Sequence, residues 1–315
     1  MDGTIATNPR LRFLALPLHR QGLLAVLGAA VLWSTGGLFI KWVSLDAPGV
    51  TMWRSLFAGA TIAIVARPRG IAPWRAGWLT WGLALSYASM LLLFVTATKL
   101  TTAANAIFLQ FTAPLYLLVL GRFFLDERPT RLDLAAVAVA FGGMGLFFVG
   151  RLEPRDTAGN LCAIGSGVAF ATFLVLLRQP SCTPETRPRA MILGNVLLVA
   201  GSVAVNAFHE PGAFVPGAGD LGGLLFLGVV QIGLAYVLFG FGIAHVQALE
   251  ASLIGMLEPV LNPVWVFMFL GESPGWWAVA GGAVIITAVV ARTAATERRR
   301  AALARAEFGV LSAES

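Results

Sequence analysis

The sequence predicts an all-α integral membrane protein with ten transmembrane helices, arranged as two inverted five-helix repeats with both termini in the cytoplasm. Three observations carry this prediction: the apolar composition, ten regularly spaced apolar runs, and a repeat of the first half of the chain in the second. Of the 315 residues, 57% are hydrophobic and 12% are charged. Soluble domains have about 45–50% apolar and about 25% charged residues, so this composition excludes a soluble globular protein.

The apolar runs define the predicted spans, since a helix that crosses the hydrocarbon core needs about 20 apolar residues. The runs lie at residues 21–44, 50–66, 76–98, 102–121, 132–150, 158–178, 190–208, 220–244, 250–270 and 275–292. We expect helices because a helix satisfies its own backbone polar groups in lipid. Residues 1–20 remain as a cytoplasmic amino-terminal segment and residues 296–315 as a basic cytoplasmic tail.

The basic residues predict the orientation of these spans. Of the 22 Lys and Arg residues, 17 fall in segments that share one side of the membrane with both termini. The positive-inside rule places that side in the cytoplasm. The net charge of +6 follows from this pattern, so we expect no nucleic-acid partner. The run Arg298–Arg300 suits an anionic lipid surface.

The second half of the chain repeats the first. A shift of 145 residues aligns three distinctive pairs, Pro114 with Pro259, Glu127 with Glu272 and Pro129 with Pro274. Each repeat, residues 21–150 and residues 151–295, then holds five spans. Because five is odd, the second repeat enters the membrane from the opposite side. Such inverted repeats are typical of carriers that alternate access to a central site.

The motifs at these positions resemble those of a known family. They are Trp33-Ser34, Arg54, Pro114 followed by Leu125-Asp126-Glu127-Arg128, and Leu257-Glu258-Pro259 followed by Leu270-Gly271-Glu272. Over nearly its whole length the chain is similar to ten-span EamA-type members of the drug/metabolite transporter superfamily. The resemblance implies a carrier in the bacterial inner membrane that exports amino acids, metabolites or drugs through a central cavity. Aromatic amino-acid exporters are its nearest functional analogues within the family.

Glu258 is the main candidate for binding solute or protons. It lies near the middle of the ninth span, where an ionised side chain costs about 2.5 kcal/mol or more. Asn262 and Trp265 follow at i+4 and i+7 on the same helix face, so we expect this stripe to face a cavity. The sequence leaves two readings of Glu258 open: a group that couples transport to protons or binds a substrate amine, and a protonated carboxyl in a helix–helix hydrogen bond.

Prolines interrupt the fourth and ninth spans. Pro114, Pro259 and Pro263 each remove a backbone hydrogen bond, and we expect a helix break or kink at each. Breaks at corresponding positions of two repeats point to a central binding site. A kink that improves packing is the alternative.

The fourth span offers two polar faces. Asn105, Thr112 and Tyr116 form one stripe, and Gln110 lies about 140° away from Asn105. We expect the Asn105 stripe to line the cavity and Gln110 to bond a neighbouring helix.

Further cavity candidates are aromatic or amide side chains in other spans: Trp33, Phe170, Tyr87, Tyr236 and Gln231. Trp33 and Phe170 occupy corresponding places in the two repeats and could flank a planar apolar solute. The alternative for all five is packing in the core.

Three charged residues complete the predicted set. Arg54 lies about 6 Å into the second span, shallow enough to snorkel, and is expected to be structural or to attract a carboxylate at the outer mouth. Glu127 and Glu272 occupy equivalent loops on opposite faces, where we expect them to cap helices or pair with Arg as gating contacts.

These features predict a secondary transporter that exports small metabolites, above all amino acids, by alternating access. Drugs and phosphorylated metabolites are alternative solutes, and an intramembrane enzyme is a lower alternative because no nucleophile–base pair or metal-ligand set is visible. We expect no enzymatic activity, cofactor or metal. The expected partners are a small-molecule solute, the lipid bilayer and, as candidate coupling ions, protons. Ten spans with internal symmetry allow a functional monomer without excluding a homodimer.

Overall fold

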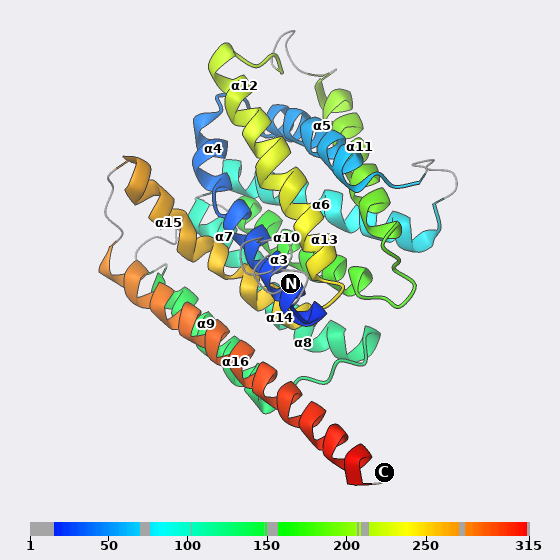
Figure 1. Cartoon of the computed structure of the whole chain (residues 1–315). Coiled ribbons are helices and arrows are strands. Elements are labelled where there is room, and N and C mark those ends of the chain that lie inside the picture. The colour runs from blue at the N-terminus through cyan, green and yellow to red at the C-terminus, as the bar shows by residue number, and fades with distance from the viewer. Residues whose placement is uncertain are drawn as a thin grey trace, which may run out of the picture.

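The computed structural model describes residues 16–69, 76–101, 103–147, 149, 157–206, 208, 214–270 and 275–313, and the regular structure in these ranges is helical. In chain order the helices are α3 (Leu18–Trp33), α4 (Gly36–Trp42), α5 (Ala47–Ala66), α6 (Trp78–Leu100), α7 (Ala103–Gln110), α8 (Ala113–Phe124), α9 (Arg131–Phe147), α10 (Thr157–Leu177), α11 (Thr186–Asn206), α12 (Ala218–Leu225), the π-helix η2 (Phe226–Leu234), α13 (Ala235–Gly242), α14 (Ala248–Gly255), α15 (Leu257–Leu270) and α16 (Trp276–Ala313). Figure 1 shows them as one bundle, with α16 reaching beyond it.

Within the described ranges, eight helical segments are long and apolar enough to cross a bilayer. They are Leu18–Ile40, Ala47–Ala66, Trp78–Leu100, Asn105–Phe124, Thr157–Leu177, Thr186–Asn206, Ala218–Gly242 and Trp276–Arg299. The fifth and ninth predicted spans are also helical, but α9 has 17 residues and the ninth span is divided into α14 and α15. The chain is therefore all-helical in these ranges and of the multi-pass membrane type.

Three of the predicted spans are broken. The first is interrupted at Ser34 and Thr35, the fourth at Phe111 and Thr112, and the ninth at Met256. The breaks of the fourth and ninth spans correspond, because the shift of 145 residues maps α7 onto α14 residue by residue.

The prolines explain two of these breaks. Pro114 and Pro259 lie in the first turn of α8 and α15. A backbone N–H in the first turn has no acceptor within its own helix, so proline, which lacks this N–H, is tolerated there. The break expected at Pro263 is wrong: α15 continues through that residue as regular helix, and the Pro263 side chain lies outside the described part of the structure.

The two halves of the sequence pack directly against each other. The contacts pair α9 with α16, α5 with α11, α6 with α10 and α3 with α13. Glycines allow close approach: a Cβ on Gly143 would lie 2.9 Å from the Gly281 carbonyl oxygen, and a Cβ on Gly242 would lie 2.8 Å from that of Gly22. Small residues at such contacts are typical of helix packing in membranes.

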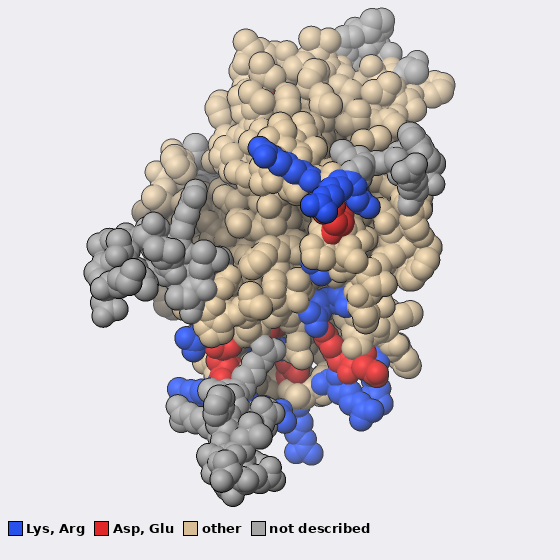
Figure 2. Space-filling view, turned by 45° about the vertical axis from the view of Figure 1, so that its right-hand side comes forward, with Lys and Arg blue, Asp and Glu red and all other residues tan. Residues whose placement is uncertain are grey.

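The outer surface is largely apolar. Phe123, Trp78, Ile64 and Met268 are 74%, 72%, 68% and 64% exposed, as is common for side chains that face lipid. Figure 2 shows one face, on which charged side chains gather in two groups and most of the visible surface is uncharged. The tail expected from residue 296 continues the helix of α16 to Ala313.

Candidate solute cavity between the two halves

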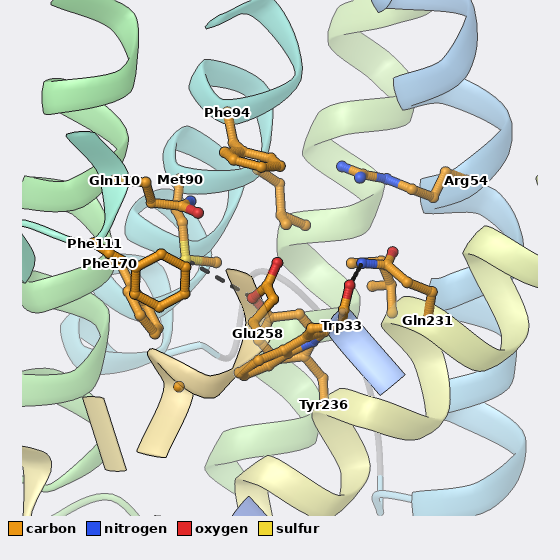
Figure 3. Close-up of a pocket in the computed structure, with 13 residues that line it drawn as sticks. Trp33, Arg54, Met90, Phe94, Gln110, Phe111, Phe170, Gln231, Tyr236 and Glu258 are labelled. Carbon is orange, nitrogen blue, oxygen red and sulfur yellow. Dashed lines mark hydrogen bonds between the residues drawn. The ribbon is translucent and has the colours of Figure 1, made fainter. Parts of the chain in front are cut away.

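A cavity lies between helices from both halves of the sequence. It is lined by Trp33, Arg54, Met90, Leu91, Phe94, Gln110, Phe111, Phe170, Gln231, Ile232, Tyr236, Gly255 and Glu258. Its volume of about 40 Å³ holds a few water molecules, at about 10–15 Å³ for each. Figure 3 shows the labelled side chains converging on this space from several helices.

The irregular backbone of the bundle meets at this cavity. Trp33 ends α3 at the first break, Phe111 lies in the break between α7 and α8, and Gly255 and Glu258 flank the break at Met256. Gln231 belongs to the π-helix η2, an element that is rare and frequently found at functional sites. Broken helices at membrane depth are tolerated where they line a cavity or are buried in protein.

Aromatic rings form much of the cavity wall. The Trp33 ring lies 5.0 Å from the rings of Tyr236 and Phe239, measured between centroids, and Tyr236 stands edge-on to Tyr87 at 4.8 Å. The Tyr236 hydroxyl lies 3.9 Å from the Met90 sulfur. These contacts form a largely apolar, polarisable surface with ring spacings usual for aromatic pairs.

The cavity also contains polar atoms without protein partners. Arg54 is 1% exposed, and its Nε and Nη2 atoms have no hydrogen-bond acceptor among the described residues. Trp33 Nε1 and Gln231 Oε1 likewise have no hydrogen-bond partner among the described residues. The amide nitrogen of Gln231 does donate to the Trp33 carbonyl oxygen, at 3.4 Å. Unpaired buried polar groups are uncommon and call for an explanation.

Glu258 supplies the opposite charge. Its side chain lines the cavity, and no hydrogen bond or ion pair connects it to the described residues. Figure 3 shows its carboxylate and the Arg54 guanidinium entering the same space from different helices. The cavity therefore combines one cationic group, one acidic group and an aromatic wall.

The sequence model of the EamA-like transporter family matches residues 20–149 and 157–292. The chain belongs to this family. The resemblance drawn from the motifs is thus confirmed, and the family is one of membrane transporters.

Curated relatives of this EamA-like chain carry transporter names. An "Uncharacterized transporter" of Archaeoglobus fulgidus is 26% identical over 258 residues, covering 81% of this chain and 89% of the relative. A "Probable terminal-alkyne amino-acid exporter" of Streptantibioticus cattleyicolor is 28% identical over 269 residues, covering 82% and 88%. A solved crystal structure with 20% identity has a TM-score of 0.75 over 87% of this chain and 98% of its own, which shows a shared fold.

Five of the predicted cavity residues of this EamA-like transporter line the cavity: Trp33, Phe170, Gln231, Tyr236 and Glu258. Arg54 joins them, which corrects the expectation of a snorkelling side chain at the outer mouth, because its guanidinium is buried. Tyr87 stands behind the wall, where its hydroxyl accepts a hydrogen bond from Asn195 Nδ2 at 3.2 Å.

The two faces of the fourth span agree with our prediction only in part. Gln110 makes the expected bond to a neighbouring helix, since it donates to Ser166 Oγ of α10 at 2.8 Å, but it also lines the cavity. Asn105 lies away from the cavity lining and donates to Asn160 Oδ1 at 3.0 Å. The break at Phe111 separates Asn105, in α7, from Thr112 and Tyr116, so the predicted stripe does not continue along one helix face.

Thr112 and Tyr116 follow the same break. The Thr112 hydroxyl caps the Leu109 carbonyl at 2.6 Å and lies 3.3 Å from the Tyr116 hydroxyl, so both side chains belong to the helix junction and not to the cavity lining. Trp265 donates from Nε1 to Ser34 Oγ at 2.8 Å, which ties α15 to the first break. The Asn262 side chain and Glu272 lie outside the described part of the structure.

Glu127 pairs with Arg178, one of its two expected roles, at 3.3 Å between Oε1 and Nη2. Burial raises the pKa of the Glu127 carboxyl above its ordinary value, and the Arg178 charge opposes that rise.

The sequence analysis missed a second set of buried charges, which we call the ionic cluster: Arg292, Asp133, Glu250, His19 and Glu297. Arg292 Nε donates to Asp133 Oδ1 at 3.0 Å, and Arg292 Nη1 lies 2.9 Å from Glu250 Oε1. The second contact is an ion pair without hydrogen-bond alignment. His19 Nε2 lies 3.2 Å from Glu297 Oε1 and 3.8 Å from Glu250 Oε2.

A local signal existed for one member of the ionic cluster. Thr130 and Asp133 have capping-box spacing, and the Thr130 backbone N–H donates to Asp133 Oδ2 at 2.8 Å. Glu250 and Arg292 are at the ends of predicted spans, where charges are ordinary, and 42 residues separate them in the sequence. Their pairing depends on how α14 and α16 pack.

Proposed function

We propose that this EamA-like protein is a secondary transporter that exports small metabolites, amino acids above all, by alternating access of the cavity between its two halves. The observation that carries the proposal is the cavity itself. It is lined from both halves, contains buried polar atoms without partners in the described part of the chain, and lies where three helix breaks meet. Discontinuous helices that meet at one site between two repeats are typical of secondary transporters.

The proposal includes ten spans in two inverted five-helix repeats. The family model matches two separate segments of the chain, residues 20–149 and 157–292, which supports a duplicated unit. The corresponding breaks at Phe111 and Met256 support it as well, as do helix contacts that pair members of one half with members of the other. Rocking of one half against the other would expose the cavity to each side in turn.

The proposed location is the bacterial inner membrane with both termini in the cytoplasm. The argument is the distribution of Lys and Arg along the sequence. In this orientation the loop with Glu127 faces the cytoplasm.

Amino acids are the proposed solutes because of the chemistry of the cavity and the name of one relative. The relative from Streptantibioticus cattleyicolor is named as a probable amino-acid exporter. Protons are proposed as coupling ions through Glu258, whose carboxyl group lines the cavity without a partner among the residues that the structure describes. A Glu258→Gln variant is then expected to transport without a response to an imposed pH gradient.

Efflux from proteoliposomes tests the proposal. The full chain is reconstituted, the vesicles are loaded with labelled aromatic, aliphatic and hydroxyl amino acids, and efflux is followed with and without a pH gradient. Selective efflux supports the exporter, and its response to the gradient supports proton coupling. Folded protein that moves none of these amino acids would overturn the proposed solute class and direct the test to drugs and phosphorylated solutes.

A further inference from the structure

We propose that Arg54 and Glu258 form a clamp for a zwitterion, in which Arg54 binds the carboxylate and Glu258 binds the ammonium group of an α-amino acid with an apolar side chain. This inference rests on the proposed function and specifies how the same cavity would select its solute. It assigns Arg54 to solute recognition inside the cavity, whereas its position in the sequence suggested a structural role or the attraction of a carboxylate at the outer mouth.

The state of Arg54 is the first argument. A guanidinium carries five N–H donors in a planar fork that matches a carboxylate. Here the side chain is 1% exposed, its Nε and Nη2 atoms have no acceptor among the described residues, and it points into the cavity (Figure 3). A buried cation without a partner is costly, and inside a membrane it marks a substrate pathway more often than a structural contact.

The second argument is that the cavity holds both charges. Glu258 contributes a carboxyl group from α15 and Arg54 a guanidinium from α5, so with the carboxyl ionised the site is neutral but strongly dipolar. A zwitterion is also neutral, and its two charged groups can each face an opposite charge. A phosphate ester would meet repulsion from Glu258, and a cationic drug would meet repulsion from Arg54.

The neighbouring atoms supply the rest of the recognition. Trp33 Nε1 is a buried donor and Gln231 Oε1 a buried acceptor, and neither has a partner among the described residues. One can add a hydrogen bond to the carboxylate and the other to the ammonium group. The aromatic wall of Trp33, Phe170 and Tyr236 then receives the side chain of the solute, which favours apolar over charged amino acids.

Competition binding tests the clamp directly. The purified full chain is incubated with labelled L-leucine and with unlabelled L-leucine, L-leucine amide, which lacks the carboxylate, or N-acetyl-L-leucine, which lacks the ammonium group. We expect each analogue to compete about 10- to 100-fold more weakly than L-leucine, because each leaves one buried charge unpaired. This comparison needs no variant, so it does not depend on the folding of a mutant.

Two variants assign each loss to a residue. In Arg54→Gln the amide should compete about as well as L-leucine, while N-acetyl-L-leucine should still compete weakly. In Glu258→Gln, N-acetyl-L-leucine should compete about as well as L-leucine, while the amide should still compete weakly. Arg122→Gln, at an exposed position of α8 outside the cavity lining, is the matched control and should keep the wild-type pattern. Arg54→Lys keeps the charge and should retain most of the discrimination.

The outcomes separate the clamp from the proposed function. Discrimination that is lost as described supports the clamp. If the protein moves amino acids in proteoliposomes but the analogues compete as well as L-leucine, the clamp is overturned and the exporter stands. If a folded wild-type protein neither binds nor moves amino acids, both the proposed solute class and the clamp are overturned.

Discussion

Two regions of this protein bury charged side chains, and they do so in opposite ways. In the ionic cluster, Arg292 contacts both Asp133 and Glu250, and each group is nearly inaccessible. In the cavity, Arg54 is as buried as Arg292 but has no acceptor for its Nε and Nη2 atoms among the described residues. The comparison separates charges that the fold itself neutralises from charges that are available to a solute.

The two glutamates of the ninth span differ in the same way, although they lie close together in the sequence. Glu250 lies in α14 and belongs to the ionic cluster, whereas Glu258 lies in α15 and lines the cavity. The break at Met256 stands between them. One broken span thus carries a paired acidic group on one segment and, on the other, an acidic group without a partner among the described residues.

The largest expected effect is the loss of the paired arginine. Arg292→Met leaves Asp133 and Glu250 buried without a counter-charge, and breaking a buried ion pair costs about 3–5 kcal/mol. We expect a strongly lowered melting temperature in detergent, measured by size-exclusion chromatography after heating. The triple variant Arg292→Met, Asp133→Leu and Glu250→Leu removes all three charges and should recover much of the loss. An unchanged melting temperature in Arg292→Met would contradict a structural role for the cluster.

The same substitution at the cavity should have the opposite sign. Arg54→Met removes a buried cation whose Nε and Nη2 atoms have no acceptor among the described residues. We therefore expect a higher melting temperature and a free energy of unfolding raised by about 1–3 kcal/mol. Binding of amino acids should be lost in the same variant. A stability loss as large as that of Arg292→Met would show that Arg54 is held by the fold, and would remove the contrast between the two regions.

The loss of a hydrogen bond between uncharged side chains provides a reference for the stability changes expected in the two charged regions. Trp265→Phe removes the donor to Ser34 Oγ, and we expect a loss of about 1 kcal/mol. A double-mutant cycle with Ser34→Ala checks that the loss belongs to this contact, since the two substitutions should not be additive. Additive effects would show that the two side chains are not coupled.

The smallest effect concerns pH. Because burial raises the pKa of Glu127, its contribution to stability is complete below the pKa of the unfolded chain and is lost as the pH rises through the higher pKa of the folded state. From pH 4 to pH 7 the melting temperature of the wild type should therefore fall slightly more than that of Glu127→Gln. The corresponding difference in the free energy of unfolding should be under about 1 kcal/mol. Identical pH profiles would contradict the shift.

The predictions from sequence succeeded where a local pattern carries the information. Apolar run length located helices at all ten predicted ranges, and the aligned prolines marked the breaks before Pro114 and Pro259. Five residues named as cavity candidates line the cavity, although for the aromatic and amide ones the sequence left packing in the core open as the alternative. The predicted stripe of Asn105, Thr112 and Tyr116 does not line the cavity, because Asn105 bonds Asn160 and the stripe assumed one continuous helix across Phe111.

The sequence by itself determined the helical class, the membrane environment, the family and the candidate role of Glu258, because composition, run length and short motifs are properties of neighbouring residues. Only the tertiary structure decided which buried charges have partners. Arg292 meets Glu250 because α16 and α14 come together, and Arg54 enters the cavity because α5 packs against η2. Pairing of charges across helices depends on their relative placement, which no local pattern encodes.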